Sequence, residues 1–215
     1  MPPRRERPVL FVLAGVNGAG KSSLGGALLR SAGLSYFNPD EIARRIRTET
    51  GCSANDANAL AWEEGRRRLE FAIEHRSSYA LETTLGGRTM PALVAKAADV
   101  GFDVYIWFVG LSDPELHIAR VHARVAAGGH DIPEDMIRTR FDTSRRNLIA
   151  LMARVTELKV FDNSVPGVPD AFPEPQLLLH LRRSRIVAPP LGKLFKTPEW
   201  AKAIVAAALK LSRAR

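Results

Sequence analysis

The sequence predicts a three-layer α/β fold, in which a parallel β-sheet lies between helices on both faces. Apolar, strand-like runs alternate with helical patterns along most of the chain, and this alternation is typical of a parallel sheet with helical crossovers. The first apolar run leads directly into the glycine-rich segment GVNGAGKSS. The length of 215 residues suits one such domain with a small appendage.

The glycine-rich segment follows the strand predicted at 9–14 and precedes a helix predicted at 22–32, which is the context that a P-loop requires. Its fixed glycines, lysine and serine match the pattern G-x-x-x-x-G-K-S. In such a loop the backbone N–H groups turn inward to phosphate oxygens, the lysine reaches the β- and γ-phosphates, and the serine hydroxyl ligates Mg²⁺. We therefore expect ATP to be bound by Gly15, Val16, Asn17, Gly18, Ala19, Gly20, Lys21, Ser22 and Ser23, with Ser22 as the metal ligand.

The remaining elements follow in order. Further strands are predicted at 34–38, 78–83, 103–110 and 158–162, with a sixth candidate at 176–181. Helical patterns cover 54–75, 89–100, 114–126 and 134–155, and an alanine-rich amphipathic helix is predicted at 198–211. Ligands of such sheets bind beyond the carboxyl ends of the strands. Polar residues that directly follow a strand are therefore site candidates.

Asp40 and Glu82 are the acidic candidates at strand ends. Asp40 follows the second predicted strand and Pro39, and two roles are open to it: it can face the cleft, to accept a proton from a substrate hydroxyl or help hold Mg²⁺, and it can serve as the N-cap of the next helix. Glu82 lies at the carboxyl end of the third strand, at 78–83, where positioning of the substrate or an indirect contact with the metal would satisfy its carboxylate. A structural salt bridge would equally satisfy a buried carboxylate at Glu82.

The region after the fourth strand predicts a helical lid over the nucleotide, at about residues 120–146. Arg120 and Arg124 lie four residues apart on one helix, the segment 128–130 (GGH) interrupts the pattern, and Arg138 and Arg140 lie on the next helix. Guanidinium groups of this kind stabilise the charge of a phosphoryl group in transfer. A solvated basic hairpin would show the same pattern.

Two further segments bear on function. The turn at 162–164 (DNS) is a candidate for the adenine pocket, although an Asx turn explains it equally well. At the apolar end of the fourth strand, residues 109–111 carry no carboxylate and the next one is Asp113, so the acidic pair of a P-loop motor is missing. This favours a small-molecule kinase.

Bulk properties narrow the class of protein. The net charge of +8 and the pI of about 10.1 favour anionic ligands. A nucleic-acid-associated, ATP-binding switch is the alternative function, but with 7% aromatic residues the chain offers no stacking platform interleaved with its basic residues. Cys52 is the single cysteine. We expect a cytoplasmic protein without a membrane-spanning segment or a secretory signal.

The segments GVNGAGKSS, NPDEI, LETTLGG, RVHARVAAGGHDIPEDMIRTRF and VFDNS together resemble the zeta-toxin-like family of P-loop kinases, over about residues 8–165. The resemblance implies a five-stranded parallel sheet of order 2-3-1-4-5. It also implies an ATP- and Mg²⁺-dependent kinase that phosphorylates a hydroxyl of a small molecule, possible examples being nucleotide sugars such as UDP-N-acetylglucosamine.

The resemblance also implies roles for individual residues. Lys21 and Ser22 match the phosphate and magnesium positions, Asp40 matches the catalytic base, and Glu82 and Thr83 match a substrate-contacting segment. The catalytic lid arginines are placed at Arg124 and Arg140, with Arg120 and Arg138 as rivals. We expect a kinase domain at 1–185 and a helical tail at 186–215 that packs on the core or on a partner. An antitoxin-like protein is the partner that the resemblance suggests.

Overall fold

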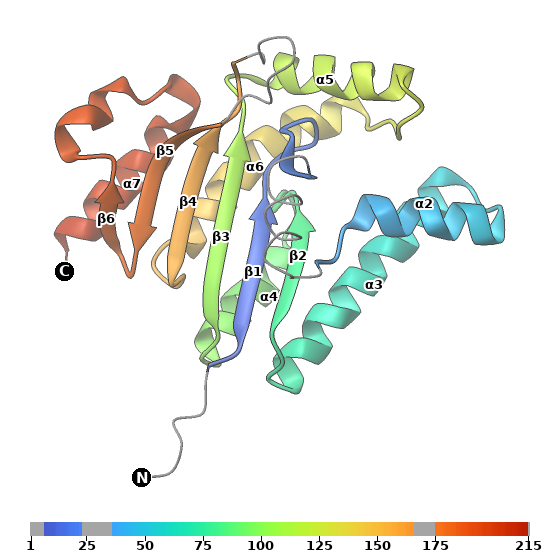
Figure 1. Cartoon of the computed structure of the whole chain (residues 1–215), viewed down its shortest axis with the longest axis horizontal. Coiled ribbons are helices and arrows are strands. Elements are labelled where there is room, and N and C mark those ends of the chain that lie inside the picture. Colours follow the sequence, from blue (N-terminus) through green and yellow to red (C-terminus); the bar gives the residue numbers. More distant parts are fainter. Residues whose placement is uncertain (1–6, 23–35, 166–174, 215) are drawn as a thin grey trace.

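The structure is a computed structural model, and it describes residues 7–22, 36–165 and 175–214. Within these residues one sheet has six strands in the order β2-β1-β3-β4-β5-β6 (Figure 1). The strands are β1 (Val9–Ala14), β2 (Tyr79–Thr83), β3 (Asp103–Gly110), β4 (Glu157–Asp162), β5 (Gln176–Arg182) and β6 (Arg185–Ala188). The first four are parallel, whereas β5 and β6 are antiparallel to their neighbours.

The predicted α/β class is confirmed, but the predicted count of five parallel strands is wrong. Of the strand expected at 34–38, Phe37 forms only an isolated parallel bridge with Leu81 of β2, and residues 34 and 35 lie outside the described residues. Pro39 follows closely and has no N–H to extend a ladder. The predicted neighbour order still holds, since Phe37 lies beside β2, and β1, β3 and β4 follow.

Strand β6 was not predicted, because its hairpin lacks the usual turn residues. Arg183 and Ser184 connect β5 to β6, and both have positive φ angles, of 46° and 65°. Two-residue hairpin turns of this kind normally use Asn-Gly or Asp-Gly, because glycine and asparagine tolerate positive φ. An Arg-Ser pair gives no such signal in the sequence.

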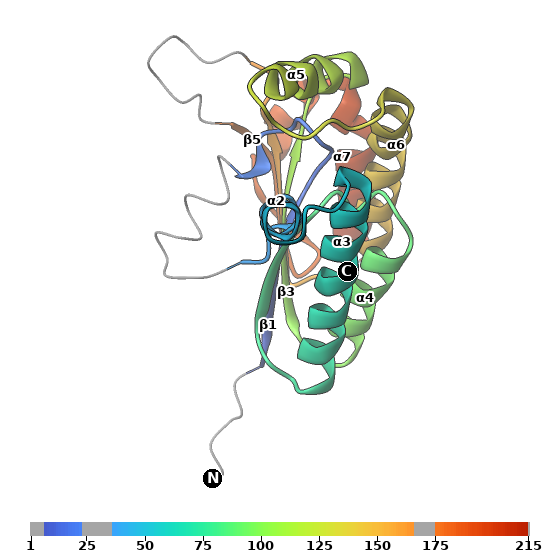
Figure 2. The ribbon, with the colours of Figure 1, turned by 90° about the vertical axis from the view of Figure 1, so that its right-hand side faces the viewer.

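Helices α3, α4, α6 and α7 lie together on one face of the sheet (Figure 2). The described helices are α2 (Pro39–Thr50), α3 (Ala54–Glu74), α4 (Thr89–Asp99), α5 (Pro114–Ala126), α6 (Glu134–Leu151) and α7 (Lys202–Arg213), with 3₁₀ turns at Leu191–Lys196 and Glu199–Ala201. Lys21 and Ser22 are helical, and the rest of the helix predicted at 22–32 lies outside the described residues. In the described part of the chain, every helix is too short or too polar to cross a membrane.

The C-terminal segment packs into the main hydrophobic core. Trp200 is only 3% exposed, and its indole lies against Gly110 at the end of β3. A Cβ at Gly110 would lie 2.3 Å from the Trp200 Cη2 atom, so only glycine admits the ring. Ile204 and Ala208 of α7 join the same core. The division of the chain at residue 185 stays a prediction.

We expect Trp200→Ala to lower the free energy of unfolding by about 3–5 kcal/mol, because it empties a large, fully enclosed site in the core. Urea denaturation would measure the loss. Leu191→Ala is the control, since Leu191 is 66% exposed, and its effect should stay within about 0.5 kcal/mol. Equal stabilities of the wild type and the Trp200 variant would contradict the burial of Trp200 in the core.

Candidate active site

The P-loop curls tightly at the carboxyl end of β1. Gly15, Gly18 and Gly20 have φ angles of +140°, +80° and +83°, which residues with a Cβ rarely adopt. A Cβ at Gly15 would lie 2.1 Å from the backbone oxygen of Val109, and one at Gly18 would lie 2.6 Å from that of His117. The loop therefore keeps its shape only with these glycines, and this shape is the cradle that a phosphate group fits.

Two neighbouring side chains brace the loop from outside. His117 of α5, which is 1% exposed, donates from Nδ1 to the backbone oxygen of Asn17 at 2.8 Å. Asn163, in the polar turn after β4, donates from Nδ2 to the backbone oxygen of Ala19 at 2.9 Å. The turn predicted to line the adenine pocket thus braces the P-loop, and its Asp162 side chain accepts from the Ser164 N–H at 3.0 Å as an Asx turn does.

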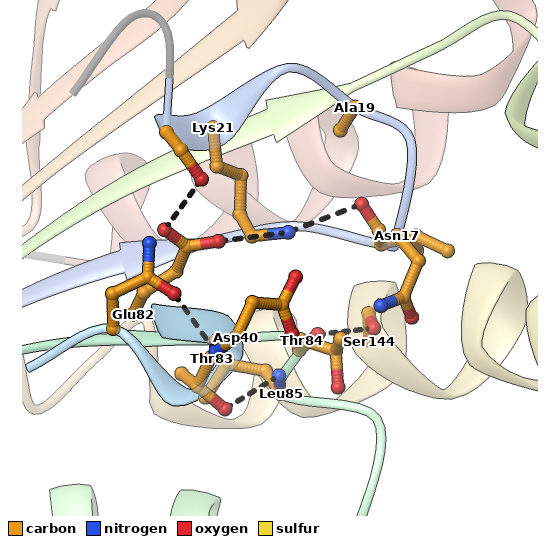
Figure 3. Close-up of polar contacts among 12 residues, drawn as sticks. Asn17, Ala19, Lys21, Asp40, Glu82, Thr83, Thr84, Leu85 and Ser144 are labelled. Atoms are coloured by element: carbon orange, nitrogen blue, oxygen red, sulfur yellow. Dashed lines mark hydrogen bonds and ion pairs between the residues drawn. The ribbon is translucent and has the colours of Figure 1, made fainter. Parts of the chain in front are cut away.

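Lys21 and Glu82 form a buried ion pair at the base of the loop. The Lys21 Nζ atom lies 3.5 Å from Glu82 Oε1, and their side chains are 7% and 8% exposed. Ser22 donates from its hydroxyl to Glu82 Oε2 at 3.0 Å (Figure 3). The salt bridge predicted as one alternative for Glu82 is therefore present. The same carboxylate lies near the end of β2, where a contact with the substrate is predicted.

Asp40 does not cap α2, contrary to one of the two roles considered for it. Asn38 is the N-cap, and its Oδ1 atom accepts from the N–H groups of Asp40 at 2.9 Å and Glu41 at 3.4 Å. Pro39 occupies the first helical turn, where its missing N–H costs nothing. Within the described residues the Asp40 carboxylate has no hydrogen bond to the backbone, and its side chain is 45% exposed in the cleft.

The lid is a helical hairpin formed by α5 and α6, and Arg124 crosses from it to Asp40. Gly128, with φ +86°, and Gly129 end α5 by donating to the backbone oxygens of Val125 and Arg124. Arg124 donates to the backbone oxygen of His130 at 2.7 Å and lies 3.4 Å from Asp40 Oδ2. Among the described residues its Nε–H has no partner, although it is buried.

Arg140 reaches the P-loop from the second arm of the lid. Its guanidinium donates to Asn17 Oδ1 at 2.9 Å, and burial lowers the pKa of Arg140 while the charge of Asp40 opposes that shift. Its aliphatic part passes over Gly86, where a Cβ would lie 2.6 Å from Arg140 Cγ. Of the predicted lid arginines, Arg124 and Arg140 thus lie on either side of the space above the P-loop.

The two rival arginines differ from each other. Arg120 lines the cleft and donates to the backbone oxygen of Asn163 at 2.8 Å, and burial lowers the pKa of its guanidinium. Arg138 points outward to Glu115, at 3.0 Å, and to Glu134, at 2.9 Å. Arg138 therefore points away from the cleft, whereas Arg120, Arg124 and Arg140 line it.

The segment after β2 forms a tight loop that α6 holds. The Thr83 hydroxyl accepts from the Leu85 N–H at 3.1 Å, and Leu85 has a positive φ of 53°. Asn147 of α6 donates to the backbone oxygens of Leu85 at 2.6 Å and Gly87 at 2.9 Å, and Ser144 donates to that of Thr84 (Figure 3). Thr83 and Glu82 both line the cleft, and their contact with a substrate stays a prediction.

These residues surround one cleft of about 970 Å³. Lys21, Asp40, Glu82, Arg124 and Arg140 all line it, so residues from five separate segments meet at the carboxyl edge of the sheet. A further wall of the cleft, on α3, was not predicted; it is made by Asn55, Asn58 and Trp62, and the lid residue His130 also lines the cleft. Their spacing places the α3 residues on one helix face, but nothing local shows that this face meets the cleft.

The residues present fit a magnesium ion held largely by nucleotide. In the described ranges no group of three His, Cys, Asp or Glu side chains could hold a metal by itself. The oxygen donors at the loop are the Ser22 hydroxyl and the Glu82 carboxylate. Mg²⁺ prefers hard oxygen ligands and usually takes only one or two from protein, with phosphates and water as the others. Ser23, also predicted to bind ATP, lies outside the described residues.

Comparisons with known proteins agree with this geometry. The sequence model of the family described as "Zeta toxin" matches residues 1–166. An uncharacterized protein of Haemophilus influenzae is 32% identical over 130 residues, which is 59% of this chain and 88% of that protein.

Two solved structures are similar in fold. One is the AvrRxo1-ORF1:AvrRxo1-ORF2 complex with ATP, with 18% identity and a TM-score of 0.61 over 94% of this chain and 64% of that one. The other comes from the PezAT chromosomal toxin–antitoxin system of Streptococcus pneumoniae, with 14% identity and a TM-score of 0.54 over 74% of this chain and 68% of that one.

The buried histidine behind the P-loop leads to a prediction on acid stability. Burial lowers the pKa of His117 from 6.5 to about 4, so the unfolded chain binds a proton there that the folded chain does not. Stability from this residue is therefore present above pH 6.5 and declines as the pH falls toward 4, by at most roughly 1.4 kcal/mol per pH unit.

We expect the unfolding free energy of His117→Gln to fall less than that of the wild type between about pH 7 and about pH 5. Gln keeps a donor for the Asn17 oxygen but does not titrate. Urea denaturation at both pH values measures the two slopes. Equal slopes would show that His117 is not buried in its neutral form.

Proposed function

The chain belongs to the zeta toxin family, and from that premise we propose that it is a kinase that transfers the γ-phosphate of ATP to a hydroxyl of a small molecule with the help of Mg²⁺. One observation carries this proposal: within the described residues, a P-loop lysine, a carboxylate without a hydrogen bond to the backbone and two lid arginines line the same cleft. This is the set of groups that phosphoryl transfer needs, because the reaction depends on positioning and on stabilising negative charge.

The P-loop end of the cleft binds the triphosphate. The curled backbone from Gly15 to Lys21 offers N–H groups to the phosphates, and the Lys21 ammonium exchanges its contact with Glu82 for the β- and γ-phosphate oxygens. The Ser22 hydroxyl and Glu82 would hold Mg²⁺, directly or through water, which neutralises charge on the phosphates when bound.

Asp40 acts as the catalytic base. Asn38 takes over the capping of α2, so the Asp40 carboxylate is not used as a cap, and its Oδ1 atom can face a substrate hydroxyl. Its partner is Arg124, at 3.4 Å, and both side chains are partly open to solvent. When phosphate draws Arg124 away, the carboxylate can accept the proton of the attacking hydroxyl.

Arg124 and Arg140 stabilise the phosphoryl group during transfer. The buried Nε–H of Arg124 has no acceptor among the described residues and can donate to a phosphoryl oxygen. Arg140 lies in a desolvated position, where its charge is poorly screened. Both guanidinium groups are already held by chain oxygens, so little reorganisation is needed at the moment of reaction.

A nucleotide sugar such as UDP-N-acetylglucosamine is the acceptor that we propose to test first, because of the resemblance to characterised zeta toxins. Glu82 and Thr83 are proposed to contact the acceptor side of the cleft. In the structure Glu82 is engaged by Lys21 and Ser22, so a direct contact with the acceptor would require Lys21 to have moved to the phosphates.

A protein partner that restrains the activity is also part of the proposal. The PezAT structure is described as a toxin–antitoxin system, and we propose that an antitoxin-like protein holds this kinase inactive. Expression that arrests growth in the wild type but not as Lys21→Ala would support a toxic kinase. Equal arrest by both proteins would contradict it.

We expect Asp40→Asn to reduce phosphoryl transfer at least 100-fold while changing the Kd for ATP less than about threefold, because the amide keeps the size of the side chain but cannot act as a base. The measurements are transfer of label from ATP to a metabolite panel that contains UDP-N-acetylglucosamine, and calorimetry for ATP. Full activity of this variant would remove Asp40 from the role of base, and a wild-type protein that binds ATP but labels nothing would contradict the kinase.

Arg140→Ala and Arg138→Ala form a matched pair on α6. We expect Arg140→Ala to lower kcat by about 10²–10³, since it removes a cation that faces the phosphoryl group. Arg138→Ala should leave kcat within about twofold, because Arg138 pairs outside the cleft with Glu115 and Glu134. Similar losses of kcat in both variants would contradict a specific role for the Arg140 guanidinium and would assign the effect to the lid hairpin as a whole.

A further inference from the structure

The proposed chemistry leaves one buried histidine without a role. His117, near the start of α5, is only 1% exposed, and its Nδ1 atom lies 2.8 Å from the backbone oxygen of Asn17. Because a carbonyl oxygen only accepts, Nδ1 carries the proton and Nε2 is left as an acceptor. Among the described residues Nε2 is buried without a hydrogen-bond partner. A buried acceptor without a donor costs free energy, so an apolar side chain would fill this place at lower cost. What the histidine adds is its N–H donor to the P-loop.

The first half of the P-loop is joined to the base of the lid at three consecutive residues. The Val16 side chain belongs to an apolar cluster with residues of both lid helices, namely Ile118, Val121 and Ile137. The backbone of Asn17 accepts from His117, and a Cβ at Gly18 would lie 2.6 Å from the His117 backbone oxygen. Phe141 of α6 packs edge to face on the His117 ring, with 5.8 Å between the ring centroids. This part of the loop is therefore coupled to the lid hairpin.

Asn17 connects this joint to Arg140. Its Oδ1 atom accepts from the Arg140 guanidinium at 2.9 Å. The aliphatic part of Arg140 passes over Gly86, where a Cβ would lie 2.6 Å from Arg140 Cγ, but the bonds beyond Cγ keep the rotamer freedom of a long side chain. The contact with Gly86 therefore fixes where the side chain enters the cleft, and the hydrogen bond to Asn17 fixes where its charge lies.

Arg140 differs from the other two lid arginines of the cleft in what holds it. Arg124 donates to a backbone oxygen of the lid itself, and Arg120 donates to a backbone oxygen after β4. Arg140 is held by a side chain of the loop that is shaped to cradle phosphates. Its position therefore follows the shape of the P-loop, and a substitution of Asn17 can release it while every backbone N–H of the loop is kept.

We propose that His117 and Asn17 are positioning residues for Arg140. His117 fixes the Asn17 peptide against the lid, and the Asn17 side chain sets the guanidinium of Arg140 over the place of the γ-phosphate. The inference rests on the proposed kinase function, because that function gives Arg140 a γ-phosphate to face.

Nucleotide affinity tests the role of Asn17 without phosphoryl transfer. Calorimetry with ATP and with ADP, in Mg²⁺ and without an acceptor, gives the ratio of the two Kd values, which reports contacts to the γ-phosphate. We expect Arg140→Ala to lower the preference for ATP about tenfold and Asn17→Ala about fivefold, with the Kd for ADP within about twofold in both. Because both residues act through one guanidinium, the double variant should lose no more than Arg140→Ala alone.

Arg138→Ala is the matched control on α6, since Arg138 pairs outside the cleft with Glu115 and Glu134. It should leave the preference for ATP unchanged, both alone and when it is added to Asn17→Ala. Losses that add fully for Asn17 and Arg140 would overturn the proposal. The same holds for an Asn17→Ala variant that keeps the full preference for ATP, or a wild type that has none.

Two substitutions of His117 separate positioning from packing. His117→Leu fills a similar space without a donor, whereas His117→Gln keeps an N–H for the Asn17 oxygen. We expect His117→Leu to lower kcat about tenfold with the KM for ATP within about threefold, and His117→Gln to recover most of kcat. A purely structural role predicts instead that kcat follows the unfolding free energy of each variant, measured in urea. Unchanged kcat in a folded His117→Leu variant would remove His117 from the role, and the nucleotide ratios decide the role of Asn17 even where this variant does not fold.

The two kinds of measurement separate this inference from the proposed function. Coupled losses of the preference for ATP, in a protein that labels no acceptor, would support the positioning of Arg140 and contradict the kinase. Transfer that is impaired by Arg140→Ala but left intact by both Asn17→Ala and His117→Leu would contradict the positioning and leave the kinase standing.

Discussion

The buried pair formed by Lys21 and Glu82 is the interaction on which the rest of the site depends. A carboxylate that is 8% exposed is stable only beside a cation and hydrogen-bond donors, and Lys21 and Ser22 supply both. Glu82 can occupy this place because β2 pairs with β1, in register from Leu10 to Ala14, and so ends level with the P-loop. The order of the strands therefore sets the charge balance of the loop, and a bound triphosphate must compete with Glu82 for the lysine.

The sequence predicted the features that depend on local patterns, and it missed those that depend on how distant segments meet. The spacing of Gly15, Gly20 and Lys21 identified the P-loop, since its backbone conformation requires glycine at fixed points. The residues Asn38 and Asp40 are both good caps, and only the structure shows that Asn38 takes this role. Trp62 belongs to the cleft because of how α3 packs, and no periodicity within the helix records that packing.

The lid arginines show how the fold prepares a cationic site without leaving its charges free. Arg140 is held by the Asn17 side chain, Arg124 by the backbone oxygen of His130, and Arg120 by that of Asn163. Asn17 and Asn163 belong to the P-loop or brace it, so two of the arginines take their positions from the phosphate cradle. In the proposed phosphoryl transfer, such preorganised charges would lose little energy to reorientation.

This arrangement also bears on the high positive charge of the chain. A net charge of +8 would attract nucleic acid if it were spread over an open surface. Exposed arginines such as Arg44, Arg47 and Arg67 carry part of this charge. Lys21, Arg124 and Arg140, in contrast, line a cleft, and each already contacts an oxygen of the chain. A ligand gains binding energy only if it offers several closely spaced oxygens that replace these contacts together. A triphosphate does so, whereas a single anion would have to displace one satisfied contact at a time, and this is the physical reason to regard the cleft as a nucleotide site.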